Sequence, residues 1–133
     1  MPSALVYFDG ACLGNPGPMG AGAVVEMDGA RKELSRPLGR GTNNQAEYGG
    51  LILGLTEALE QGADEVTVRG DSQLILRQLE GRYRVKAPGL KALHDEAGGL
   101  LGRFRKARLE WIPRAENADA DRLAGMAAST AQR

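Results

Sequence analysis

Residues 42–62, TNNQAEYGGLILGLTEALEQG, decide the fold because they predict one long helix packed on a core. The apolar side chains recur with the spacing of one helical face, at Tyr48, Leu51, Ile52, Leu55 and Leu59. Thr42 and Asn43 are typical capping residues at the start of such a helix. Glu47 lies four residues before Leu51, at the edge of the apolar face, so we expect its carboxylate to point toward the protein.

Short apolar or alternating runs on both sides of this helix predict strands. ALVYFD, residues 4–9, has the pattern of a buried strand that ends in Asp9, and GNPGPMG, residues 14–20, is typical of turns. Asp28-Gly29 divides residues 21–38 into a predicted hairpin. Residues 64–71, DEVTVRGD, alternate and end in Asp71. Residues 107–112, ARLEWI, form the last predicted strand, in which Trp111 is interpreted as a packing residue.

Three further helices complete the predicted order of elements. They are expected within residues 72–81, 90–104 and 113–130, and we expect Asn117 to cap the last one. The order is then three strands, helix, strand, two helices, strand, helix, which predicts an α/β fold with a mixed sheet flanked by helices. Residues 1–133 suit a single domain, and the final STAQR is expected to fray.

The bulk composition bounds the class of protein. Lys plus Arg and Asp plus Glu number 17 each, so the chain does not have the charge of a strongly basic nucleic-acid binder, although a local basic patch remains possible. A single cysteine, Cys12, allows no internal disulfide and favours a reducing compartment. Neither a signal-peptide pattern nor a long apolar run is present, so we expect a cytoplasmic protein without a membrane partner. No feature demands more than a monomer.

Four acidic residues are expected to converge. Asp9 and Asp71 end two strands, and if these strands are parallel neighbours, both carboxylates emerge at the same edge of the sheet. Glu47 lies near the start of the connecting helix, and Asp121 near the start of the last helix. Crowded carboxylates repel one another, and a divalent cation relieves this repulsion. Oxygen ligands without cysteine or histidine suit Mg²⁺ or Mn²⁺, and two such ions about 4 Å apart form the usual clamp for phosphodiester hydrolysis.

Each of these acids also has a simpler explanation. Asp71 precedes SQLILRQ and would make a good N-cap for that helix. Asp121 and Glu47 would complement the dipoles of their helices. From the residues alone, both readings stay open.

Four motifs resemble, in order and spacing, the signatures of type 1 ribonuclease H: YFDGACLGNPGPMGAG, TNNQAEYGGLILGL, VRGDSQLILRQLEG and ENADADRLA. The resemblance covers essentially the whole chain, and the first two motifs are long and specific. It implies a ribonuclease H-like fold with a mixed five-stranded sheet. It also implies metal-dependent cleavage of the RNA strand of RNA–DNA hybrids, which leaves 3′-hydroxyl and 5′-phosphate ends.

The resemblance also implies roles for individual residues. Asp9, Glu47, Asp71 and Asp121 would be the catalytic ligands of two ions, with Asp9 bridging both, Asp121 on the ion that activates water, and Glu47 and Asp71 on the other. Thr42 would meet a phosphate of the DNA strand. Side chains that line the minor groove of the hybrid, where short amides can both donate and accept, would be Cys12, Asn15, Asn43, Asn44 and Gln73.

Two departures from longer relatives stand out. The loop IPRAEN before the last helix is short and lacks the catalytic-loop histidine of many relatives, and Arg114 in this loop is a candidate auxiliary residue for product release or phosphate binding. The basic helical protrusion is missing, so tight, processive binding is not implied. RYRVK, residues 82–86, offers a smaller basic substitute for phosphate contacts or is an ordinary solvated connection.

Three other functions remain to be weighed against cleavage of hybrids. Compact members of this family are candidates for cutting double-stranded RNA as well. A binding module without turnover has little reason to keep four mutually repelling carboxylates. A nuclease for DNA junctions or transposon ends is disfavoured by the TNN and GNPG motifs, which are the expected readers of 2′-hydroxyl groups.

Overall fold

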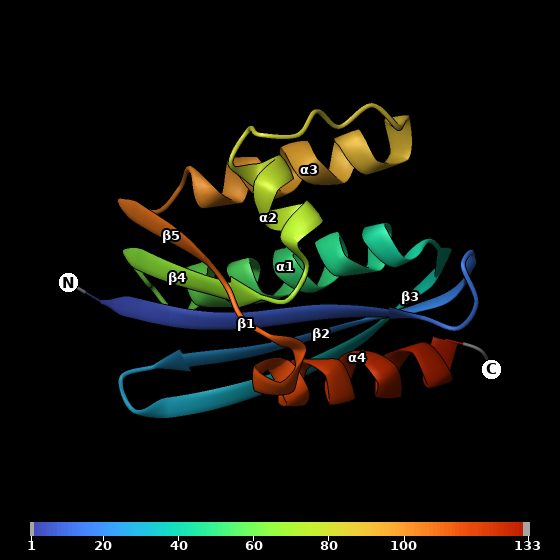
Figure 1. The fold of residues 1–133 in the computed structure, drawn as a ribbon. Coiled ribbons are helices and arrows are strands. Elements are labelled where there is room, and N and C mark those ends of the chain that lie inside the picture. Colours follow the sequence, from blue (N-terminus) through green and yellow to red (C-terminus); the bar gives the residue numbers. More distant parts are fainter. Residues whose placement is uncertain (1, 132–133) are drawn as a thin grey trace.

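The computed structural model describes residues 2–131, which form a mixed five-stranded sheet between two layers of helices (Figure 1). The strand order is β3-β2-β1-β4-β5, which confirms the predicted fold class. The strands are β1 (Ser3–Cys12), β2 (Gly17–Met27), β3 (Ala30–Gly41), β4 (Glu65–Gly70) and β5 (Lys106–Trp111). The helices are α1 (Asn43–Glu60), α2 (Gln73–Leu79), α3 (Pro88–Leu101) and α4 (Ala118–Ala131), with a 3₁₀ turn, η1 (Arg114–Asn117), before α4.

Helix α1 forms where its periodicity predicts it. Thr42 is the N-cap, and its hydroxyl accepts from the backbone N–H of Gln45, whose side chain in turn accepts from the Thr42 N–H. This reciprocal pair is a capping box, which satisfies two backbone donors that a helix start leaves free. Tyr48, Leu51 and Leu55 are fully buried and join the main core between α1 and the sheet.

The two faces of the sheet are covered differently. Helices α1, α2 and α3 lie on one face and α4 alone on the other (Figure 1). A Cβ atom at Gly22 of β2 would collide with the backbone of Ala120 and Ala124 in α4. Because glycine lacks this atom, α4 lies directly against the strand, and this contact fixes the height of the helix above the sheet.

The hairpin between β2 and β3 turns where it was predicted. Asp28 and Gly29 both have positive φ, 54° and 77°, as the favoured two-residue hairpin turn requires. Strand β1 pairs with β2 in the antiparallel sense and with β4 in the parallel sense.

Three details of the sequence-based description were wrong. Asp9 does not end its strand, because the ladder with β2 carries β1 on to Cys12, whereas the parallel pairing with β4 stops at Tyr7 and Arg69. The predicted turn at residues 14–20 is shorter, because β2 already begins at Gly17. Asn117 does not cap α4 from outside but lies in η1 with its side chain buried.

The C-terminal tail falls partly outside this description. Of the STAQR segment that was expected to fray, residues 129–131 belong to α4, and residues 132–133 lie outside the described residues. Within residues 2–131, none of the helices has both the length and the apolar character needed to cross a bilayer.

Candidate metal centre and nucleic-acid surface

Three carboxylates meet at the end of the parallel pair β1–β4. Asp9 lies on β1, Glu47 in the second turn of α1 and Asp71 directly after β4, and each offers an oxygen within 4.8 Å of the others. Helix α1 reaches this close because Gly10 leaves room for it: a Cβ there would collide with the backbone of Ala46 and Glu47. The local glycine therefore sets the position of Glu47 above the strand.

Burial makes the ionised form of these carboxylates unfavourable when no cation is bound. Asp9 is 4% exposed, and loss of water raises the pKa of its carboxyl, with the charge of Asp71 adding to the effect. Burial also raises the pKa of Glu47, and the neighbouring Asp9 raises it further. The Gly10 N–H donates to Asp9 at 2.9 Å, but Oε2 of Glu47 is buried and has no partner among the described residues. An oxygen-only cluster with an unpartnered buried carboxylate fits a hard divalent cation such as Mg²⁺ or Mn²⁺.

Asp121 approaches the same place from the other face of the sheet. It lies in the first turn of α4 and lines, with Asp9, Glu47 and Asp71, a cavity of about 350 Å³. It is more open than the others, its side chain being 44% exposed, and it is not part of the set whose oxygens lie within 4.8 Å. The four predicted acids therefore line one cavity. Three of them, Asp9, Glu47 and Asp71, lie close together at one end of it.

The alternative explanations fare differently at each acid. Ser72, not Asp71, caps α2, because the Ser72 hydroxyl accepts from the Ile75 N–H. The N-cap explanation for Asp71 is therefore wrong. Asp121 does lie in the first turn of its helix, so a favourable interaction with the helix dipole accompanies its place in the cavity.

Arg114 lies at the rim of this cavity. Its Nη2 is 3.8 Å from Oδ1 of Asp121, and its side chain is 81% exposed. The guanidinium is therefore free to move toward a phosphate that enters the cavity.

Sequence reasoning missed the part that Asn117 plays. Its Nδ2 donates to the Phe8 carbonyl at 2.9 Å and to Oδ2 of Asp71 at 3.1 Å, and the residue is 2% exposed. Both partners accept hydrogen bonds, which fixes the orientation of the amide. Asn117 thereby links the interior of β1 to the segment that follows β4 and orients the Asp71 carboxylate. Because its partners are remote in sequence, no local pattern could have identified this role.

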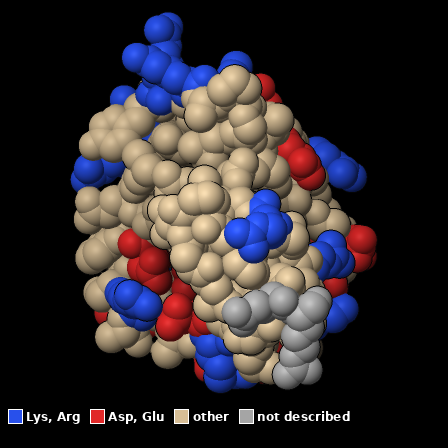
Figure 2. Space-filling model, turned by 90° about the vertical axis from the view of Figure 1, so that its right-hand side faces the viewer, with Lys and Arg blue, Asp and Glu red and all other residues tan. Residues whose placement is uncertain are grey.

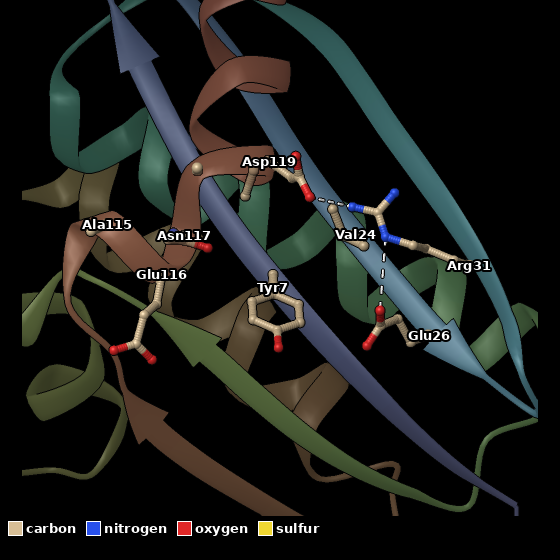
Figure 3. Close-up of a pocket in the computed structure, with 10 residues that line it drawn as sticks. Tyr7, Val24, Glu26, Arg31, Ala115, Glu116, Asn117 and Asp119 are labelled. Atoms are coloured by element: carbon tan, nitrogen blue, oxygen red, sulfur yellow. Dashed lines mark hydrogen bonds and ion pairs between the residues drawn. The ribbon is translucent and has the colours of Figure 1, made fainter.

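The far side of Asn117 borders a second, smaller cavity of about 210 Å³ (Figure 3). Figure 3 shows Asn117 beside the Tyr7 ring, with Arg31 paired to Asp119 across the opening at 2.6 Å and to Glu26 at 3.8 Å. These ion pairs link β2 and β3 to the start of α4, the helix that carries Asp121.

Most of the predicted nucleic-acid residues line the carboxylate cavity or the hollow next to it. Cys12 and Asn43 line the carboxylate cavity itself. Oδ1 of Asn15 accepts from the Asn43 N–H at 3.1 Å, which joins the loop after β1 to the start of α1. A hollow of about 480 Å³ continues from there, lined by Asn15, Thr42, Asn43, Asn44, Gln45, Ala87, Gly89 and Leu90.

Gln73 is separate from this group. It starts α2 and lines a hollow with Trp111 on the other side of Asp71. Of the predicted nucleic-acid residues, Gln73 therefore lies in a different hollow from the others. Figure 2 shows a group of Lys and Arg side chains at the top of one face, while basic and acidic side chains are interspersed over the rest of that face.

Comparisons with known proteins show which family the chain resembles. Residues 7–127 match the family model described as "Reverse transcriptase-like". The bifunctional protein Rv2228c of Mycobacterium tuberculosis is 47% identical over 96% of this chain, and ribonuclease HI of Halobacterium salinarum is 45% identical over 91%. The chain spans 36% of the length of the first relative and 62% of the second.

Solved structures match over nearly the full chain. The N-terminal RNase H domain of Rv2228c from Mycobacterium tuberculosis superposes with a TM-score of 0.94 at 44% identity, over 98% of this chain and 96% of that domain. LC11-RNase H1, solved in complex with RNA/DNA hybrid, superposes with a TM-score of 0.88 at 38% identity, over 98% and 99%. The chain therefore belongs to the type 1 ribonuclease H family.

Proposed function

We propose that residues 1–133 form a metal-dependent endoribonuclease domain that hydrolyses the RNA strand of RNA–DNA hybrids. The observation that carries this proposal is the convergence of Asp9, Glu47 and Asp71 from three separate elements onto one partly buried point, with Asp121 on the same cavity. Membership of the ribonuclease H family supports it, as does the RNA/DNA hybrid bound to LC11-RNase H1.

The four acids are the proposed ligands of two Mg²⁺ or Mn²⁺ ions. When bound, such ions supply a nucleophilic water near neutral pH and stabilise the leaving oxygen. Asp9 is the proposed central ligand, because it is the least exposed acid of the cluster and lines the same cavity as the other three. Asn117 donates to Oδ2 of Asp71 and leaves Oδ1 for an ion. Products with 3′-hydroxyl and 5′-phosphate ends are expected.

The neighbouring amides are the proposed readers of the hybrid. Asn15, Asn43, Asn44 and Gln73, with the Cys12 thiol, lie beside the cavity, where they would meet 2′-hydroxyl groups and base edges in the wide minor groove. Thr42 is the proposed contact to a phosphate of the DNA strand. At the cavity rim, Arg114 is the proposed auxiliary group for phosphate or product.

The decisive experiment incubates the protein with labelled RNA–DNA hybrid, double-stranded RNA and double-stranded DNA, each with Mg²⁺, Mn²⁺ or excess chelator. Cleavage of the RNA strand of the hybrid with either ion, and none with chelator, is the expected result. Undiminished cleavage in chelator contradicts the metal ligands. Binding of hybrid without cleavage under any divalent ion favours a binding module, and cleavage of double-stranded RNA widens the substrate range.

A further inference from the structure

We propose that the hollow beside Trp111 binds an unpaired nucleotide of the RNA strand that extends beyond the hybrid at the cut site. This inference rests on the proposed function and adds a substrate feature, a single-stranded RNA extension. The Trp111 hollow has a volume of about 300 Å³ and is lined by Gln73, Leu76, Arg77, Glu80, Arg82, Leu109 and Trp111.

The position of Trp111 contradicts its interpretation as a packing residue. Trp111 is the last residue of the edge strand β5 and is 49% exposed. Its Nε1 donates to the backbone carbonyl of Asp71 at 3.2 Å, so the indole is held in a fixed position beside a proposed metal ligand. Two more exposed apolar side chains, Leu74 and Tyr83, lie on α2 and on the connection after it. The indole of Trp111 is therefore an exposed aromatic side chain in a hollow next to the proposed cut site.

The charges around this hollow suit a nucleic-acid backbone. Arg77 stacks on the Tyr83 ring at 5.8 Å and donates to the Tyr83 hydroxyl at 3.0 Å, and it has no acidic partner in the part of the chain that the structure describes. Arg82 is balanced by Glu80 at 3.6 Å. The uncompensated guanidinium of Arg77 is therefore available to a phosphate.

The combination of an aromatic face and a guanidinium favours a single strand. Inside a duplex both faces of each base are already stacked, so only an unpaired base can lie on the indole. The strand in question is RNA, because Trp111 and Gln73 border Asp71, where the RNA strand is proposed to be cut.

Trp111 is the only tryptophan of the chain, so its fluorescence reports on this position alone. The experiment titrates the cleavage-deficient variant Glu47→Gln, with Mg²⁺ present, using a blunt hybrid and hybrids of equal paired length that carry a five-nucleotide extension on the RNA or the DNA strand, at either end. RNA extensions at one end are expected to quench the emission and to bind at least about fivefold more tightly than the blunt hybrid, the low end of base–aromatic stacking.

Two arginine variants test the charge contribution. In Arg77→Gln the ratio of the affinity for the RNA-extended hybrid to the affinity for the blunt hybrid should fall toward one. Arg108→Gln is the matched control, because Arg108 is exposed on the same strand as Trp111 but points to the opposite face of the sheet, and it should keep the preference.

Equal emission and affinity for extended and blunt hybrids, with the parent protein still cutting the blunt hybrid, overturn this inference and leave the proposed function intact. Equal effects of RNA and DNA extensions overturn the assignment to the RNA strand. If no hybrid is cut or bound, the proposed function fails, and this inference fails with it.

Discussion

At the scale of single residues, Asp71 should separate chemistry from binding. In Asp71→Asn the amide oxygen can still accept from Asn117, so the fold should persist, while one charge of the metal site is lost. We expect hybrid cleavage to fall by several orders of magnitude, because metal ligation acts mainly in the transition state. Hybrid affinity should stay near that of the parent, since the flanking amides are unchanged. Single-turnover cleavage and equilibrium binding measure the two quantities, and cleavage at the parental rate would contradict the assignment.

The matched variant on the binding side is Asn44→Ala. It removes an amide from the hollow beside α1 and leaves the carboxylates in place. Affinity for hybrid should fall, and the preference for hybrid over duplex DNA should narrow, because a partner for the 2′-hydroxyl is lost. Competition binding with both duplexes checks this, and an unchanged preference would remove Asn44 from the proposed readers.

Asn117 should matter for both stability and metal binding. Asn117→Ala leaves the Phe8 carbonyl and one oxygen of Asp71 without their donor, which should cost about 1–3 kcal/mol of unfolding free energy. The rise in melting temperature caused by Mg²⁺ should also shrink, because Asp71 is no longer oriented. Gln78→Ala is the control: Gln78 is also buried and accepts from the Tyr48 hydroxyl at 2.7 Å, and neither residue belongs to the carboxylate cluster. It should lower stability and keep the Mg²⁺ response.

At the scale of elements, the contact between β2 and α4 should control the place of Asp121. Gly22→Ala puts a Cβ against the backbone of α4, which cannot give way like a flexible side chain. We expect a loss of about 1–3 kcal/mol and reduced cleavage, as α4 moves outward with Asp121. Gly125→Ala on the same helix meets nothing within 4 Å and should raise stability by about 0.5–1 kcal/mol. Equal effects of both substitutions on denaturation midpoints would argue against a close contact between β2 and α4.

The elements also show what sequence can and cannot predict. Helix α1 and the hairpin at Asp28-Gly29 were predictable because periodicity and turn chemistry are local. The extension of β1 past Asp9 was not, because it depends on pairing with β2. The hydrogen bonds of Asn117 join segments far apart in the chain, and the exposure of Trp111 follows from the place of β5 at the sheet edge.

At the scale of the whole molecule, a divalent metal ion should change how the folding stability depends on pH. Without divalent ions, burial raises the pKa values of Asp9 and Glu47 in the folded state. The contribution of these groups to stability is then fully present below their ordinary values near pH 4 and is lost as pH rises toward and through neutrality. Mg²⁺ binds the ionised form, so its stabilising effect should grow with pH.

Melting temperatures at pH 5 and pH 8, with chelator or with saturating Mg²⁺, check this prediction. The Mg²⁺-induced rise should be larger at pH 8. In Asp9→Asn the Mg²⁺-induced rise should shrink at both pH values, because the proposed central ligand loses its charge. An equal Mg²⁺ effect at both pH values in the parent would contradict a buried metal cluster.

The convergence of four segments on one cavity has a consequence for synthesis on the ribosome. Asp9 lies on β1 and Asp121 on α4, so the proposed ligand set is complete only when α4 has emerged and docked on β2. A nascent chain that ends before α4 exposes the uncovered face of its sheet and holds an incomplete set of ligands. The proposed nuclease activity should therefore begin only after synthesis of α4, and contacts this distant in sequence place its onset among the slower steps of folding.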